Sequence, residues 1–368
     1  MSNLVEELIN EGLVCESGHG QSTGAGGKRP ILLELNTNAG FILAVYFNER
    51  WYEIALTNLA AETVTSIKKP TVIDQDYRKT LDLLIQDIRE LMRAAQTLTV
   101  SRPVLACGVA VKGLVNTHLG TLQYSAAIPE WTDVSVGEHI SNQLKLPVYL
   151  ENDARAITYA EMLFGNGVKN HVFICVSMGH GIGTGVAIQN EIFRGAYDGA
   201  VTFAHTTVME NGPLCRCGNR GCWETVASVS AFLNELERRD YSYHGMELQE
   251  VLKKYHEGDP VISDVLLNYS GYWIGVGIAN MLNVFNPEQV IIQGEITAAG
   301  EEFREKIASV VMKRALPVSR KAEISFSRLS DSIYIKGAAA VVIQRFYAKE
   351  HHQEIWPKPS LPVKEGGQ

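Results

Sequence analysis

Apolar residues recur along this 368-residue chain with two alternating periods, which predict strands and helices in turn. From Gly40 onward, runs such as FILAVYF and WYEIALTNL predict strands, and residues 74–96 carry apolar side chains at helical spacing. Further strands and helices up to Phe164 complete one α/β lobe. The plan then repeats, from the strand HVFICVSM to a helix over 336–349. The pattern therefore predicts a duplicated α/β fold with a ligand cleft between two lobes.

The N-terminal part of the chain follows a different pattern. The first 13 residues place apolar side chains on one helical face, and a glycine-rich segment and the strand ILLEL follow. This order is typical of the last part of a winged helix; the alternative is a flexible N-terminal linker. The predicted domains are a partial winged-helix segment at 1–38, lobes at 39–150 and 151–348, and a Pro- and Gly-rich tail at 349–368.

Composition and charge narrow the class of protein. With 46% hydrophobic and 20% charged residues, the chain has the composition of an ordinary globular protein. A net charge of −8 is unfavourable for coating nucleic acid, although it leaves room for a small local DNA-binding face. The longest apolar stretch, 273–285, is too short to cross a membrane. Because the N-terminus also lacks a basic, apolar leader, we predict a cytoplasmic protein with reduced cysteines.

Three of the six cysteines lie close together, in the segment CRCGNRGC, and a histidine precedes the first of them by ten positions. His205, Cys215, Cys217 and Cys222 form a set of four ligands suited to zinc. The alternative is that these cysteines are grouped by coincidence, which a chain with only six cysteines makes a poor explanation. Because four protein ligands leave no open coordination position, we predict a structural zinc ion.

His205 followed by CRCGNRGCWE resembles the signature of the ROK family of repressors and sugar kinases. The resemblance extends over most of the chain, from residue 1 to about 345, and includes GVAVKGLV, PVYLENDARAI, GIGTGV and the segment 271–294. The N-terminal segment is similar to the end of the winged helix in xylose repressors of this family. The resemblance implies a two-lobed, actin-like or ribonuclease-H-like fold and a homodimer.

The resemblance also implies ligand roles for several residues. The residues matching Asn152, Asp153, His205 and Glu224 contact the sugar in this family, and Gly113 belongs to the matching segment; in a kinase, Asp153 would be the general base. Carboxylates and a carboxamide suit vicinal hydroxyls, because they offer several acceptors and two donors. From the residues alone, Asn152 and Asp153 are equally suited to capping the helix that begins there.

The loops expected to bind ATP depart from the family pattern. Kinases of the family carry an Asp-x-Gly-Gly-Thr-type loop after the first strand, whereas residues 45–51 read VYFNERW and include no glycine. Bulky side chains and Glu49 would oppose a phosphate there. The alternating glycines of 179–185 resemble the second phosphate loop but equally suit a tight hairpin.

We therefore expect a non-enzymatic transcriptional repressor of carbohydrate metabolism. The alternatives are an ATP-dependent kinase for a hexose or amino sugar, and an oligomerisation protein that binds neither sugar nor DNA.

The expected sugar site is altered as well. Thr202 stands where the family run Gly-Glu-x-Gly-His has its glutamate, Ala127 replaces a sugar-contacting asparagine, and Lys112 replaces a proline before Gly113. Each lost hydrogen bond would cost about 1–3 kcal/mol of sugar affinity. The effector is expected to be a small molecule, a sugar by resemblance, whose identity the sequence does not specify. The alternatives are a non-sugar effector and no effector at all.

DNA is expected as a partner only if the winged helix is complete. Residues 1–40 hold five glutamates and only two basic residues, Lys28 and Arg29, which are candidate wing contacts to DNA. The helices that would precede the wing are missing from this chain. The alternatives are a truncated start or a loss of DNA binding.

Overall fold

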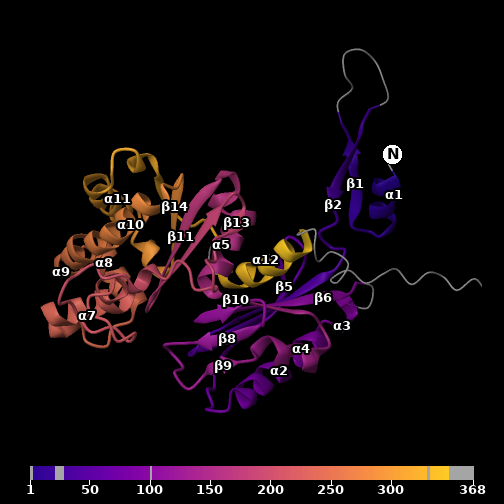
Figure 1. Ribbon diagram of the computed structural model, residues 1–368, viewed down its shortest axis with the longest axis horizontal. Helices are drawn as coiled ribbons and strands as arrows, with labels where there is room; N and C mark the ends of the chain where they lie inside the picture. Colours follow the sequence, from indigo (N-terminus) through magenta and orange to yellow (C-terminus); the bar gives the residue numbers. More distant parts are fainter. Residues whose placement is uncertain (1–2, 21–28, 100–101, 330–331, 348–368) are drawn as a thin grey trace, which may run out of the picture. The chain divides into compact units, whose positions relative to one another are not determined.

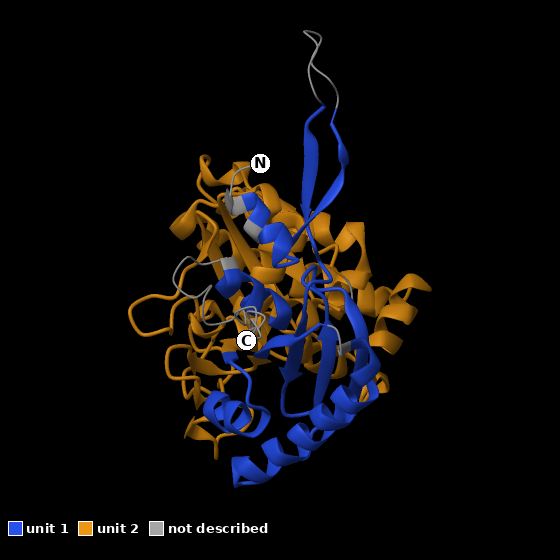
Figure 2. Ribbon diagram, turned by 90° about the vertical axis from the view of Figure 1, so that its right-hand side faces the viewer, with its two compact units in different colours: residues 1–109, 136–149, 338–368 blue, residues 110–135, 150–337 orange. Residues whose placement is uncertain are grey.

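The computed structural model describes residues 3–20, 29–99, 102–329 and 332–347 (Figure 1). Its contacts divide the chain into two compact units (Figure 2). Unit 1 comprises Met1–Val109, Val136–Tyr149 and Ala338–Gln368, and unit 2 comprises Ala110–Ser135 and Leu150–Gly337. Each of the two predicted lobes, 39–150 and 151–348, is one continuous segment, whereas each unit of the structure combines separate segments of the chain. The expected tail at 349–368 lies outside the described residues.

The N-terminal part of unit 1 is a helix followed by a hairpin. Helix α1 (Asn3–Asn10) precedes strands β1 (Val14–His19) and β2 (Ile31–Leu35), which pair antiparallel. The backbone N–H of Asn36 donates to the carbonyl of Leu13 at 2.8 Å, which closes the hairpin at its base. The described residues here therefore include the predicted helix and the predicted strand ILLEL, which pairs with a second strand.

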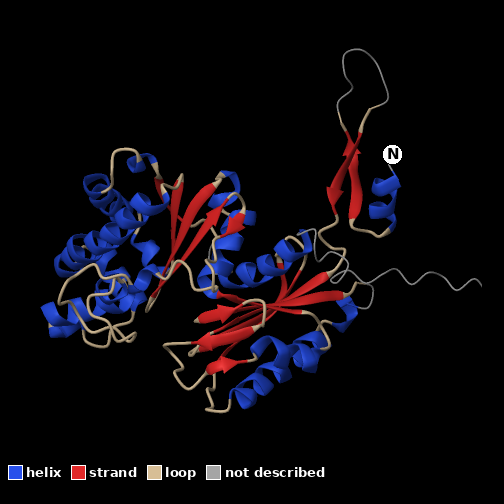
Figure 3. Cartoon of the chain, viewed as in Figure 1, coloured by secondary structure: helices blue, strands red, loops and turns tan. Residues whose placement is uncertain are grey.

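A five-stranded sheet is the centre of unit 1 (Figure 3). Strand β3 is buried at all seven positions, as its apolar run predicts. Helix α2 begins after Asp76, whose side chain accepts the N–H of Arg78 at 3.2 Å. In sheet order the strands are β10 (Val148–Asn152), β6 (Val104–Val111), β3 (Phe41–Phe47), β4 (Trp51–Thr57) and β5 (Thr63–Pro70); the helices are α2 (Tyr77–Ala94), α3 (Gln96–Thr99) and α4 (Val136–Leu144).

Unit 2 contains a second five-stranded sheet and a small three-stranded one (Figure 3). Two five-stranded sheets flanked by helices confirm the predicted duplication of the α/β plan. In sheet order the larger sheet has β13 (Glu191–Ile192), β12 (Ile182–Ile188), β11 (Val172–Met178), β14 (Gln289–Gln293) and β15 (Glu323–Phe326). The smaller sheet has β7 (Leu114–Asn116), β8 (Thr121–Tyr124) and β9 (Thr132–Val134).

Most of the remaining helices also belong to unit 2. A π-helical segment, Val265–Ser270, joins two of these helices, the one that ends at Asp264 and the one that begins at Gly271. No helix among the described residues is both long and apolar enough to cross a bilayer. The helices are α5 (Asp153–Phe164), α6 (Glu224–Ala227), α7 (Val229–Arg239), α8 (Leu248–His256), α9 (Pro260–Asp264), α10 (Gly271–Phe285), α11 (Glu301–Arg314) and α12 (Ile333–Tyr347), the last shared with unit 1.

Candidate functional site

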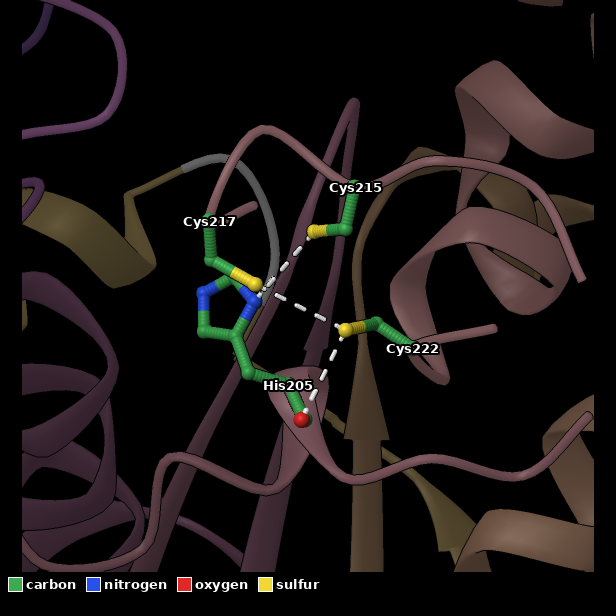
Figure 4. Close-up of side chains that lie close together, drawn as sticks. All are labelled: His205, Cys215, Cys217 and Cys222. Atoms are coloured by element: carbon green, nitrogen blue, oxygen red, sulfur yellow. Dashed lines mark hydrogen bonds between the residues drawn. The ribbon is translucent and has the colours of Figure 1, made fainter. Parts of the chain in front are cut away.

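The four predicted metal ligands converge in unit 2 (Figure 4). His205 ends a short 3₁₀ turn, and the three cysteines come from the loop before α6. One ligand atom from each residue lies within 4.8 Å of all the others. Nδ1 of His205 is 3.5 Å from Sγ of Cys215, and the Sγ atoms of Cys217 and Cys222 are 3.7 Å apart. The structure therefore brings these four residues together as the spacing predicts.

The donor set and its spacing are compatible with zinc. A tetrahedral ion about 2.3 Å from each sulfur would separate neighbouring sulfurs by roughly 3.8 Å, which agrees with the Cys217–Cys222 distance of 3.7 Å. The loop reaches this geometry because Gly218 and Gly221 adopt φ values of +89° and +66°. A side chain at Gly221 would also collide with the carbonyl of Met209.

Glu224 lies directly beside this cluster. It is the first residue of α6, and its Oε1 is 3.3 Å from Sγ of Cys215 and 3.7 Å from Nδ1 of His205. Its other oxygen, Oε2, faces Gly181, where a Cβ would come within 2.9 Å of it. His205 and Glu224, two of the residues expected to contact a sugar, therefore lie side by side at this cluster.

Asn152 caps α5. Its Oδ1 accepts the N–H of Arg155 at 3.1 Å, and its Nδ2 donates to the carbonyl of Gly113 at 2.9 Å and to Asp153 Oδ1 at 3.0 Å. Asp153 Oδ1 also accepts the N–H of Ala154 at 2.9 Å. The capping interpretation is thus confirmed, and the ligand role of the pair stays a prediction. The same contacts join Gly113, Asn152 and Asp153 into one group.

The alternating glycines connect this group to Glu224. A Cβ on Gly183, in β12, would lie 2.8 Å from Cβ of Ala154, and Gly181 faces Glu224. Gly181 lies in the bend just before β12, which begins at Ile182. Glu224 and the first turn of α5 therefore both approach the start of this strand. Its glycines allow that close approach.

The comparisons with known proteins fit this arrangement. A model of the ROK family matches residues 51–345. The chain belongs to the ROK family. A xylose repressor from Caldicellulosiruptor bescii is 32% identical to it, over 93% of this chain and 88% of the repressor. A glucokinase from Thermotoga maritima is 29% identical, over 80% of this chain and 94% of the enzyme.

A solved structure extends the similarity to the whole fold. A ROK family transcriptional regulator, described as a homologue of the E. coli Mlc protein, matches with a TM-score of 0.80 and 26% identity, over 93% of this chain and 87% of that one. The predicted ROK membership and the actin-like α/β fold are thereby confirmed.

At one ROK position the residue has changed while the backbone keeps a conformation typical of glycine. Val201, where the ROK run has glycine, adopts a φ of +67° although it is β-branched and buried. The next residue, Thr202, is exposed, and its hydroxyl donates to the carbonyl of Gly199 at 3.4 Å. Ala127 is half-buried and offers no polar side-chain atom. The chain therefore lacks a carboxylate at 202 and a carboxamide at 127.

A buried charge network behind the capping group was not predicted from the sequence. Glu151, 1% exposed, accepts the N–H of Asn152 at 2.8 Å and Nε of Arg155 at 2.7 Å. Its second oxygen accepts Nη2 of Arg194 at 2.5 Å, and Arg194 also pairs with Asp198 at 3.4 Å. The network orients the backbone of Asn152. The local signals were a charged residue inside the strand YLEN and Arg155 four positions later, whereas Arg194 lies 43 positions away.

Gly113 allows a direct test of this geometry. Its φ is +140°, and a Cβ would lie 2.5 Å from the carbonyl oxygen of Tyr124. We expect Gly113→Ala to lower the free energy of unfolding by more than the about 1–3 kcal/mol that backbone strain alone costs. Gly245→Ala is the matched control, because Gly245 has a φ of +72° and no atom within 4 Å of its Cβ position. Equal losses for both variants in urea unfolding would contradict the proposed clash.

The structure describes one of the two candidate DNA contacts. Lys28 lies outside the described residues, and Arg29 is exposed just before β2. Their role stays a prediction.

Proposed function

We propose that this ROK protein is a transcriptional repressor of carbohydrate metabolism that binds a sugar effector and does not transfer phosphate from ATP. The turn between β3 and β4 carries the proposal. Asn48 Oδ1 accepts the backbone N–H groups of Arg50 at 2.8 Å and Trp51 at 2.9 Å. Backbone N–H groups in such a turn are the usual phosphate ligands. Here the carboxamide already occupies them.

Side chains around the turn support the same conclusion. The Trp51 ring packs against Tyr46 with centroids 4.7 Å apart, and Nζ of Lys68 lies 3.8 Å from the Trp51 centroid. Bulky groups therefore fill the space that a glycine loop would leave to a nucleotide.

The N-terminal helix and hairpin support a role in DNA binding. They precede residues 51–345, which match the ROK model, and the xylose repressor covers 93% of this chain. In this proposal the hairpin acts as a wing whose Lys28 and Arg29 contact DNA, and a homodimer presents two such wings.

The effector site of the proposal consists of Gly113, Asn152, Asp153, His205 and Glu224, all in unit 2. A structural zinc ion held by His205 and the three cysteines would keep His205 in place beside Glu224. The similarity to xylose repressors makes D-xylose the first effector to test.

Calorimetry with D-xylose, other pentoses, hexoses and amino sugars tests the effector site. We expect one sugar to bind, and Asp153→Asn to weaken it about tenfold or more through the lost charged hydrogen bond. Asp82→Asn is the control, because Asp82 is half-exposed on unit 1 and pairs with His139. If none of these sugars binds, the effector part of the proposal is wrong.

Selection from a random double-stranded DNA library tests the repressor half. We expect enrichment of a palindromic sequence that the full chain binds and that the bound sugar releases. No enrichment would contradict DNA binding by this chain.

The similarity to glucokinases makes a sugar kinase the second candidate, with Asp153 as general base. A coupled assay for ADP distinguishes the two. Sugar-dependent ADP release that disappears in Asp153→Ala would establish the kinase and overturn the proposal.

A further inference from the structure

One helix, α12, contributes to both compact units. Residues 333–337 belong to unit 2, and the rest of the helix belongs to unit 1. Its side chains are buried around most of its circumference, so it cannot slide or turn without moving its neighbours. The buried residues are Ile333, Ile335, Ala338, Ala339, Ala340, Val341, Val342, Ile343 and Phe346.

The first turn of α12 reaches the candidate effector site. The Tyr334 hydroxyl is hydrogen-bonded to Gln293 and Ser177, and it lies within electrostatic range of Asp153. Gln293 ends β14, Ser177 lies near the end of β11, and their side chains are hydrogen-bonded to one another. Burial, followed by the charge of Asp153, raises the pKa of Tyr334 to about 12. A neutral tyrosine therefore lies within electrostatic range of the carboxylate proposed to bind the effector.

The same end of α12 packs closely on α5. A Cβ on Gly337 would lie 2.8 Å from the carbonyl carbon of Ala156 and 3.1 Å from the backbone N of Ile157. Ile333 forms a buried cluster with Ile157 and Ala160. A displacement of α5, which begins at Asp153, is therefore passed directly to α12.

Within unit 1, the second half of α12 packs on β6 and on the base of the hairpin. A Cβ on Gly108 would collide with the carbonyl of Ala338 and lie 3.0 Å from Cγ2 of Val342. Further along, the helix borders a small apolar cavity that is also lined by Leu35, the last residue of β2. The lining residues are Leu35, Ile42, Leu59, Leu105, Val342, Ile343 and Phe346.

We propose that α12 couples the effector site to the N-terminal hairpin, with Tyr334 as the positioning residue for Asp153 at one end and Phe346 against the hairpin base at the other. The two residues are twelve positions apart, which spans about 18 Å of helix. Because the helix is close-packed at Gly337 and again at Ala338, a shift of its first turn moves its last turns. The roles given to the two ends rest on the proposed function; the mechanical coupling does not.

Hydrogen exchange of the full chain, without sugar or DNA, tests the coupling. We expect Tyr334→Phe to change amide exchange in residues 13–19 and 31–36 by about two- to thirtyfold, the range for mutations along a coupled network. Tyr255→Phe is the matched control: its buried hydroxyl donates to Glu302 at 3.0 Å, and it belongs to α8. Exchange that is unchanged in Tyr334→Phe, or changed equally in Tyr255→Phe, would overturn the proposal.

The reciprocal variant acts from the other end of the helix. Phe346→Leu keeps an apolar side chain but loosens the cavity wall, and coupling must act in both directions. We expect faster exchange of the Ala154 and Arg155 amides, which donate to Asp153 and Asn152. No change at these amides would also overturn the proposal.

Neither exchange measurement uses an effector or an operator. A negative result in them therefore leaves the repressor proposal untouched, and failure to find a sugar that binds leaves the coupling untouched.

Discussion

Replacing Cys222 with serine is expected to remove zinc from the purified protein. Cys222 is fully buried, and its Sγ lies 3.7 Å from that of Cys217, so a hydroxyl there cannot replace the thiolate ligand. Elemental analysis should fall from about one ion per chain to near none. We expect the free energy of unfolding to fall by about 4 kcal/mol, the contribution of a ligand present at a thousand times its Kd.

Cys15→Ser is the matched control, because Cys15 lies in β1, far along the chain from the cluster, with its Sγ 3.9 Å from Glu34 Oε1. This variant should keep its zinc and its melting temperature. A chelator added to the unmodified protein should reproduce the Cys222→Ser loss. Metal-free protein with an unchanged melting temperature would contradict a structural zinc ion.

The metal cluster could be predicted because its ligands are local. Three cysteines within one loop and a histidine ten positions earlier need only a tight turn to meet, and their chemistry admits few alternatives. The strands were predictable for a similar reason, since the run of β3 is buried at every position. Both features depend on neighbours in the sequence.

Features that depend on distant parts of the chain could not be predicted in this way. The pairing of Glu151 with Arg194 joins residues 43 positions apart, and nothing in the sequence near either residue names the other. The interleaving of the two units has the same origin, because the contacts of 110–135 and of α12 are made with distant segments. Local patterns do not specify such partners.

Asn152 carries two predictions, of which the structure tests one. The helix cap follows from its position before α5, and the structure confirms it. The sugar contact depends on groups across the site, and it stays a prediction until a ligand is measured. Capping holds the side chain in one rotamer, which is also what a preorganised ligand contact requires.

Arg155→Met is expected to destabilise the protein strongly. Arg155 is 3% exposed; its Nε donates to Glu151 at 2.7 Å, and its guanidinium also donates to the carbonyl of Asp198. Methionine fills similar space but leaves Glu151 buried with one charged partner fewer. Breaking a buried pair in this way costs about 3–5 kcal/mol. Urea unfolding measures the loss.

The loss should depend on pH in a defined direction. Burial opposes ionisation of Asp198, yet hydrogen bonds from Thr117 and the charges of Arg155 and Arg194 lower its pKa overall. A lowered pKa stabilises the fold above the ordinary pKa of Asp, and this contribution disappears as the pH falls through the folded-state value. Arg155→Met should therefore lose the most stability near neutral pH and differ less from the unmodified protein in acid.

Arg78→Met separates this effect from a general loss of positive charge. The Arg78 side chain is 61% exposed and lies 3.5 Å from Asp76, so its removal should cost no more than about 1 kcal/mol. Because Glu151 also accepts the Asn152 N–H, Arg155→Met should weaken sugar binding as well, and Arg78→Met should not. Equal stability losses in the two variants, or a loss in Arg155→Met that grows in acid, would contradict the assignment of Arg155 to a buried network that orients the effector site.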